Sequence, residues 1–341
     1  MIRTLPPYVS CYTPQNAEEE PETRSSEDDR SHLNRLPSQT NKLYTGADLR
    51  ASSPRRGGIL PRMTVEDVIL RHDKRGVTAL RPHLPPDFCR QAARLLADRA
   101  GVVMITTGFY ILRTGTPETD GPPGAVVIGH ALQRLGRRVL YVTDRVSDAL
   151  MKELTDPGLV VSFPVADEAT SVRHARELLE RYRPALLVSI ERCGRTKDGR
   201  YLNMRGLDVS AETAQVDFLF AGAIPSVGVG DGGNEIGMGN VADAVAASGM
   251  LVPDPCATRV SKLVIASVSN WGGYGLIAAL SSLVGRDLLP TVDEERRLVE
   301  RTAALGAVDG TTGDADGKVD GFGPEVTAEI LTDLHALAVD R

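Results

Sequence analysis

A glycine-rich segment late in the chain holds the densest group of side chains that could do chemistry. Residues 228–240 follow an apolar run and interleave glycines with Asp231, Asn234 and Glu235. Glycine allows the backbone to approach a ligand closely, which few purely structural turns require. Carboxylates placed there can act as general acid and base, or ligate a hard divalent cation. We therefore expect a functional site in this segment.

The same segment contains a GxGxxG pattern, which by itself is a weak dinucleotide signal. It lies late in the chain, and no acidic residue stands at a strand end about 20 residues further on. We expect no dinucleotide cofactor.

A second candidate is the Gly-, Pro- and Thr-rich loop at residues 114–124, which opens a predicted helix. Amide groups at a helix start can hold an anion, and Arg113, Glu118 and Asp120 lie in or beside the loop. The loop has no Walker A sequence. A plain strand-to-helix turn is the structural alternative, but the length and charges favour a binding loop.

Other polar residues stand directly after apolar runs: Asp144, Glu191 and Asn270, together with Asp231. Such residues also cap helices, and for Asp144 this alternative is equally strong. Glu191 begins a loop of some twenty residues that is rich in arginine, which favours a function. We expect these four residues and Arg113 to surround one crevice, because the carboxyl ends of parallel strands share one edge of the sheet.

The elements that must position these residues alternate along the chain, and they predict an α/β fold. We expect a three-layer, mostly parallel, Rossmann-like sheet with helices on both faces. Apolar runs predict strands at 102–111, 139–142, 159–164, 185–190, 226–229 and 263–268. Periodicity and capping signals predict helices at 85–99, 125–135, 147–154, 167–182, 211–220 and 272–283.

Composition narrows the class of protein. The 341 residues include 39 basic and 45 acidic side chains, a net charge of −6, which argues against nucleic acid as a partner. No apolar run approaches the length of a membrane span, and no secretory signal is visible, so we expect a cytoplasmic protein without a membrane partner. Four cysteines lie far apart, which excludes a cysteine zinc site and a disulfide scaffold. The composition admits an oligomer.

The chain divides into two regions of different composition. Residues 1–60 form a polar tail, and residues 61–341 form the α/β domain. The tail is rich in Glu, Asp and Ser and has few apolar residues, so we expect it to be disordered. Deleting residues 1–60 should therefore leave the melting temperature of the protein within a few degrees of the full chain. A larger fall would show that the tail stabilises the domain.

Several sequence blocks, taken in order, resemble the D-glutamate cyclase-like C-terminal domain family over residues 64–337. They are GFY, RTGTPETDGPPGA, VTD, ERCGRTKDGRYLNMRGLDVS, VGVGDGGNEIGMGNV, SNWGGYG, AVDGTTG and VDG. Longer members of that family carry a hydro-lyase-like region before this domain. The resemblance implies site residues at Arg113, Thr114, Thr116, Glu118, Asp120, Glu191, Asn203, Arg205, Asp231, Asn234, Glu235, Asn240 and Asn270.

The resemblance implies conversion of D-glutamate to 5-oxo-D-proline and water, a carbon–oxygen lyase reaction on a small amino acid. Such a reaction needs an anchor for the α-carboxylate, which Arg113 or Arg205 fits, and proton transfer by carboxyl groups. Glu191, Asp231 and Glu235 are the candidates for that transfer.

The amides of Gly232 and Gly233 fit the developing oxyanion, and a divalent cation would also suit the carboxylates. Two alternatives stay open. One is an amide or lactam hydrolase on the same scaffold, and the other is a non-catalytic domain that binds a small acid or amino acid.

Overall fold

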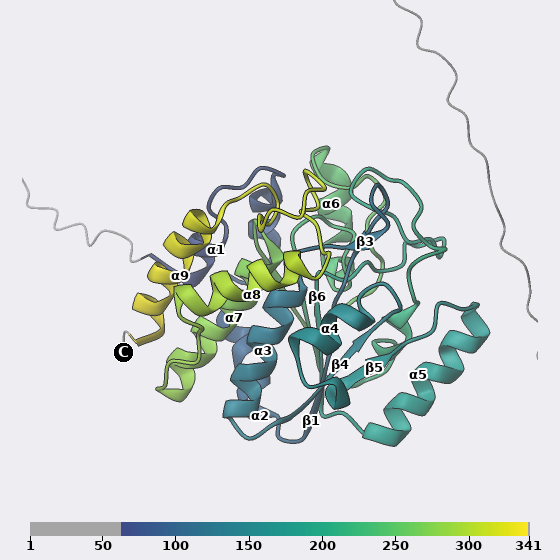
Figure 1. Cartoon of the computed structure of the whole chain (residues 1–341), viewed down its shortest axis with the longest axis horizontal. Helices are drawn as coiled ribbons and strands as arrows, with labels where there is room; N and C mark the ends of the chain where they lie inside the picture. Colours follow the sequence, from purple (N-terminus) through teal and green to yellow (C-terminus); the bar gives the residue numbers. More distant parts are fainter. Residues whose placement is uncertain (1–62, 340–341) are drawn as a thin grey trace, which may run out of the picture. The chain divides into compact units, whose positions relative to one another are not determined.

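Six parallel strands form the central sheet of the computed structural model, which describes residues 63–339 (Figure 1). The strand order is β5–β4–β1–β6–β7–β8. The bounds are β1 (Val102–Thr106), β4 (Arg138–Thr143), β5 (Val160–Ser162), β6 (Leu186–Ile190), β7 (Ser226–Gly230) and β8 (Lys262–Ile265). The predicted three-layer α/β fold is confirmed, and the predicted tail at 1–60 lies outside the described residues.

Successive side chains of each strand point to opposite faces of the sheet, and each face packs into its own hydrophobic core. In β1, Val103 and Ile105 join one core, whereas Met104 joins the other. The larger core is covered by α2 (Phe88–Asp98), α3 (Pro122–Arg134) and α7 (Ser269–Val284), with α1 (Val65–Ile69), α8 (Val292–Ala304) and α9 (Pro324–Val339) outside them. The smaller core is covered by α5 (Glu168–Tyr182) and residues 214–220 (Figure 1).

The remaining elements are short. They are α4 (Asp148–Leu154), α6 (Ala242–Ser248), the antiparallel pair β2 (Tyr110–Ile111) and β3 (Thr116–Pro117), and the 3₁₀ turns η1 (Val77–His83), η2 (Pro157–Leu159), η3 (Val216–Leu219) and η4 (Met238–Asn240). None of the helices in residues 63–339 combines the length and hydropathy that crossing a bilayer requires.

The strand predicted at 102–111 is wrong beyond Thr106. Gly108 has a φ of +103°, outside the extended region, and it turns the chain away from the sheet. A Cβ at Gly108 would also lie 2.4 Å from the Ser147 hydroxyl. Tyr110 and Ile111 instead pair with Thr116 and Pro117, so the predicted binding loop is a short hairpin followed by a turn.

The helix predicted at 211–220 is also wrong, because side chains from distant segments bind the backbone groups of Ala214 in its middle. The Ala214 amide donates to the Asp144 carboxylate at 3.1 Å, and the Ala214 carbonyl accepts from Arg192 at 2.9 Å. Only the turn η3 forms there. Smaller differences lie at helix starts, since α3 begins at Pro122 and α7 at Ser269, three residues before each predicted start.

Candidate active site

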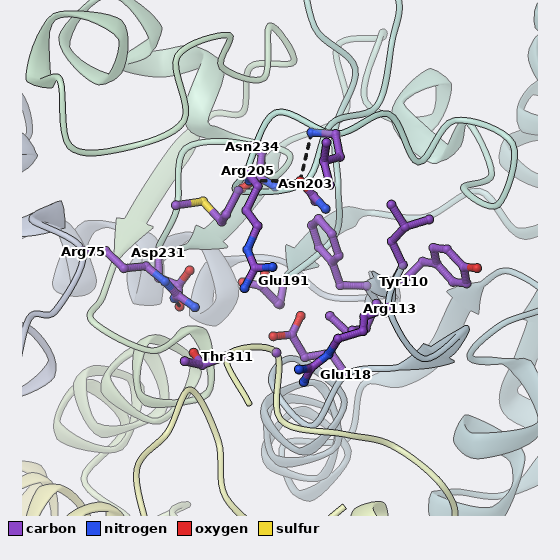
Figure 2. Close-up of a pocket in the computed structure, with 16 residues that line it drawn as sticks. Arg75, Tyr110, Arg113, Glu118, Glu191, Asn203, Arg205, Asp231, Asn234 and Thr311 are labelled. Carbon is purple, nitrogen blue, oxygen red and sulfur yellow. Dashed lines mark hydrogen bonds and ion pairs between the residues drawn. The ribbon is translucent and has the colours of Figure 1, made fainter. Parts of the chain in front are cut away.

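A pocket of about 370 Å³ opens beyond the carboxyl ends of the central strands (Figure 2). Its polar lining includes Glu191 after β6 and Asp231 after β7, and Arg113 from the hairpin. The expected convergence of these three residues is therefore found. The pocket is also lined by Arg75, Phe109, Tyr110, Ile111, Leu112, Glu118, Asn203, Met204, Arg205, Leu207, Asn234, Gly310 and Thr311.

Glu191 occupies a constrained position at the floor of the pocket. Its φ is +41°, a left-handed conformation that is unusual for a side chain other than Gly, Asn or Asp. The Ser269 hydroxyl donates to its Oε2 at 2.6 Å, and the side chain packs on Gly121, where a Cβ would lie only 2.7 Å from the Glu191 Cβ. Backbone strain of this kind concentrates at functional sites.

Arg75 links two acidic side chains that are 89 positions apart in the chain. Its guanidinium forms ion pairs with Asp231 and with Asp320, including a hydrogen bond from Nη1 to the Asp320 Oδ2 at 2.9 Å. Asp320 also has a positive φ, of +53°. Burial by itself would lower the pKa of Arg75, but the charges of Asp231 and Asp320 outweigh burial and raise it. Arg75 therefore stays charged beside the two carboxylates.

The side chain of Glu235 points toward the backbone of the loop to which it belongs. Its Oε1 accepts the amides of Asp231 at 3.0 Å and Gly232 at 2.6 Å, and its Oε2 accepts that of Gly233 at 2.8 Å. The expected oxyanion site at Gly232 and Gly233 is therefore wrong, because those amides already donate to a buried carboxylate. The glycines allow this tight turn around Glu235.

Asp120 and Asn270 tie the 119–124 turn to α7 instead of lining the pocket. Asp120 accepts the amides of Ser269 at 2.8 Å and Asn270 at 2.7 Å, at the start of α7. The Asn270 Oδ1 accepts the amides of Gly121 and Gly124 at 3.0 and 2.8 Å. Both residues thus fix the backbone on which Glu191 rests.

Three further expected residues lie away from the pocket lining. Thr114 and Thr116 share a hydrogen bond of 2.8 Å across the hairpin turn. Asn240 bonds to both backbone groups of Val260, at 2.9 and 3.0 Å. Asn203 does line the pocket, where its Oδ1 accepts the amides of Arg205 and Leu207 and so shapes the turn that carries Arg205.

Asp144 does not reach the crevice, contrary to expectation. Its Oδ2 lies 2.5 Å from the Arg192 Nη2, and both side chains are almost fully buried. Arg192 in turn donates to the Gly108 carbonyl at 2.8 Å. The neighbouring Cys193 is buried as well, and burial raises the pKa of its thiol well above the usual range, which makes it a poor nucleophile. This pair supports the loop beneath Glu191.

The buried carboxyl groups of the site hold protons more tightly than usual. Burial, and next the charge of Glu235, raise the pKa of Glu191 well above its ordinary value. Burial and then the charge of Asp320 do the same for Glu118, and they raise the pKa of Asp120 to about 7. Glu191 makes no ion pair with a guanidinium among residues 63–339, whereas Asp231 pairs with Arg75. Burial raises the pKa of Asp231 as well, and the charge of Arg75 opposes that rise. Of the two carboxyls, Asp231 is therefore the one whose charged form a neighbouring cation stabilises.

Two overlapping carboxylate groups have the composition of a cation site. Oxygens of Asp120, Asp231 and Asp320 lie within 4.8 Å of one another, and so do oxygens of Glu191, Asp231 and Glu235. Asn234 adds a buried Oδ1 that has no hydrogen-bond partner in the described part of the chain. All these ligands are hard oxygens, which fits Mg²⁺ or Mn²⁺.

Sequence reasoning missed Arg75 and Asp320. Asp320 belongs to the VDG block, which marked it as a candidate. The block gave no sign that Asp320 forms an ion pair with Arg75. Arg75 lies in no motif. Asp309 belongs to the AVDGTTG block. Its carboxylate accepts hydrogen bonds from the amides of Thr311 and Thr312 at 2.8 and 2.7 Å, and these bonds shape the segment that carries Thr311 to the pocket.

Replacing Glu235 by glutamine should destabilise the fold by about 2 kcal/mol, because three amides lose a charged acceptor and one must face an NH₂ group. Urea unfolding measures the change. The exposed Glu168→Gln is the control and should change stability by less than about 0.5 kcal/mol. Full stability with lost turnover would instead assign Glu235 to acid–base chemistry.

Comparisons with known proteins agree with the sequence blocks. The family described as "D-glutamate cyclase-like, C-terminal" matches residues 65–335. The human protein "D-glutamate cyclase, mitochondrial" is 37% identical over 210 residues, which cover 55% of this chain and 34% of the human protein. The chain thus matches about a third of that protein's length. Its name places the human protein in mitochondria, while the cytoplasmic location expected here stays a prediction.

A solved structure, an exopolyphosphatase-related protein from Bacteroides fragilis, is also similar, with a TM-score of 0.38 and 8% identity. The alignment covers 75% of this chain and 58% of the other, and at that score it carries no argument about fold or function. The extent of the family match decides the assignment. The chain belongs to the D-glutamate cyclase-like C-terminal family.

Proposed function

We propose that this chain converts D-glutamate to 5-oxo-D-proline and water, as a carbon–oxygen lyase. The observation that carries the proposal is one pocket in which the buried carboxyls of Glu191 and Asp231 lie with the guanidiniums of Arg113 and Arg205. A relative named for this activity is 37% identical over part of the chain. The pocket offers cationic groups for a dicarboxylate and carboxyl groups for proton transfer.

The substrate is anchored by arginine. Within residues 63–339, neither Arg113 nor Arg205 forms an ion pair, and both reach the pocket (Figure 2). A guanidinium that lacks a partner can bind the α-carboxylate through two parallel hydrogen bonds. Arg75, in contrast, is occupied by Asp231 and Asp320.

Asp231 and Glu191 supply the proton transfers. Asp231, whose charged form is stabilised by the ion pair with Arg75, accepts a proton from the substrate amine, which then attacks the γ-carboxyl carbon. Glu191, kept protonated by its raised pKa, gives a proton to the departing γ-oxygen. One C–N bond forms, one C–O bond breaks, and the two protons lost by the ammonium group leave with the oxygen as water.

A divalent cation held by Asp231 and Asp320 would neutralise charge on the γ-carboxylate as a Lewis acid. Glu235, whose oxygens accept three amides, positions the loop that carries Asp231.

The test is to incubate the purified chain with D-glutamate or L-glutamate and measure 5-oxoproline, with Mg²⁺ or Mn²⁺ added and after chelation. Formation of 5-oxo-D-proline from D-glutamate supports the proposal. Binding of D-glutamate without turnover would favour the amino-acid-binding alternative instead.

Replacing Arg205 by methionine should raise KM for D-glutamate about tenfold or more, because a charge-assisted contact of about 1.5–3 kcal/mol is lost. Steady-state kinetics measures the change. Arg200→Met is the matched control from the same loop, since Arg200 is paired with Asp198 and Asp254 outside the pocket. An equal rise in both variants would contradict the anchoring role.

A further inference from the structure

The pocket has a more buried, charged inner half and a more exposed outer half that holds both apolar side chains and two guanidiniums. The inner half contains Arg75, Glu191 and Asp231. The apolar side chains of the outer half are Tyr110, Ile111 and Leu112 of the hairpin and Met204 and Leu207 of the facing loop. The exposed guanidiniums of Arg113 and Arg205 belong to the same two segments and also line the pocket. These side chains come from two segments that are about 90 residues apart, so no local sequence pattern groups them.

Two of the outer side chains are unusually exposed for their type. Leu112 is 43% exposed and Leu207 is 49% exposed, and both lie at the same pocket. A single exposed leucine needs no explanation, but apolar side chains that gather around a polar site mark a place where apolar ligand surface is buried.

Free D-glutamate does not match the apolar side chains of this outer half. It carries two carboxylates, an amine and only two methylene groups, so the charged side chains of the pocket, with Arg113 or Arg205 as the anchor, meet nearly all its chemistry. The pocket volume of about 370 Å³ falls in the range for ligands considerably larger than one amino acid. The apolar lining would gain little from such a substrate.

Resting on the function proposed above, we propose that the pocket also accepts D-glutamate whose γ-carboxyl group is joined to an apolar amine, and that it cyclises this γ-amide with release of the amine. The apolar group of the amine lies between Leu112 and Leu207. The activity is an intramolecular acyl transfer on a γ-glutamyl amide.

The step balances without water or any further reactant. A bond forms between the α-amine nitrogen and the γ-carbonyl carbon, and the bond between that carbon and the amide nitrogen breaks. The proton lost by the attacking amine goes to Asp231, and the leaving nitrogen receives one from Glu191. The products are 5-oxo-D-proline and the free amine. An amide carbonyl has no negative charge, so it is attacked more readily than a carboxylate.

The γ-position is favoured over the α-position for two reasons. Joining an amine to the α-carboxyl group would remove the charge that Arg113 or Arg205 binds. The γ-substituent, moreover, is the group that departs, and it leaves through the mouth that these apolar side chains line.

The experiment uses the full chain and a series of D-glutamate γ-alkylamides, with methyl, butyl and hexyl groups, beside D-glutamate itself. Alkyl amines of different length are equally good leaving groups, so chain length tests binding of the apolar part alone. Formation of 5-oxoproline should give a kcat/KM that rises about fourfold per methylene until the outer half is filled, the equivalent of about 0.8 kcal/mol each.

The double variant with Leu112→Ser and Leu207→Ser should reduce this dependence to less than about twofold per methylene, with each rate divided by that variant's own rate on D-glutamate. Leu305→Ser is the matched control, because Leu305 is 40% exposed at the end of α8 and lies outside the pocket. It should keep the wild-type dependence.

The outcomes separate this inference from the proposed function. Turnover of D-glutamate without reaction of the amides, a rate independent of chain length, or release of D-glutamate in place of 5-oxoproline would overturn the inference alone. Equal reaction of the α-amides would overturn the γ-placement. Cyclisation of the amides without turnover of D-glutamate would overturn the proposed function and leave the inference standing, and no reaction of either substrate would overturn both.

Discussion

Glu191→Gln is expected to lower the rate of 5-oxoproline formation from D-glutamate by about 10²–10⁴-fold, because the variant cannot give a proton to the departing oxygen. The raised pKa that keeps Glu191 protonated comes from its burial and from the charge of Glu235. For the same reason, the wild-type rate should fall as pH rises through that pKa. Circular dichroism checks the fold, and steady-state kinetics at several pH values measures both effects.

Glu295→Gln is the matched control for this variant. Glu295 is also a buried carboxyl, accepts a hydrogen bond from the Tyr274 hydroxyl at 3.1 Å, and has a pKa raised by burial to about 7. It lies in α8, outside the pocket lining. Its variant should retain wild-type rates. A folded Glu191→Gln variant with a rate within threefold of wild type would remove Glu191 from the chemistry.

Arg192→Met is expected to destabilise the domain by about 3–5 kcal/mol, because it leaves the Asp144 carboxylate charged, buried and unpaired. The Arg192 side chain is 1% exposed and that of Asp144 is 3% exposed. The Gly108 carbonyl also loses its hydrogen bond from Arg192, and the Ala214 carbonyl keeps only the amide of Val216 as a donor. Urea unfolding measures the loss, and adding Asp144→Asn should restore part of it by removing the charge.

Arg145→Met, at the next residue after Asp144, tests the specificity of this effect. Arg145 pairs with Glu212 at the surface, where its side chain is 63% exposed. Exposed pairs contribute about 0–1 kcal/mol, so this variant should be nearly as stable as wild type. A similar loss of stability in both variants would contradict the special role given to the buried pair.

The fold class was predictable because a buried strand is visible in the local sequence as a run of apolar residues. Strands β1, β4 and β6 are covered on both faces and so read as continuous apolar runs, and the helices between them imply parallel pairing. The ends of β6 and β7 also identified Glu191 and Asp231 as neighbours, since parallel strands end at one edge. The sequence was misleading where side chains replace backbone partners, as at residues 211–220, because that pairing is not local.

By itself, then, the sequence determined the parallel α/β sheet, the family and the edge at which the site lies, since these depend on local periodicity and on contiguous blocks. Only the tertiary structure decided what each charged side chain does. Arg75 forms an ion pair with Asp320, which lies 245 positions later in the chain. The carboxylate oxygens of Glu235 accept hydrogen bonds from three amides of its own loop. The role of a carboxylate depends on the donors and charges within a few ångströms of it, and chain folding brings those together from distant segments.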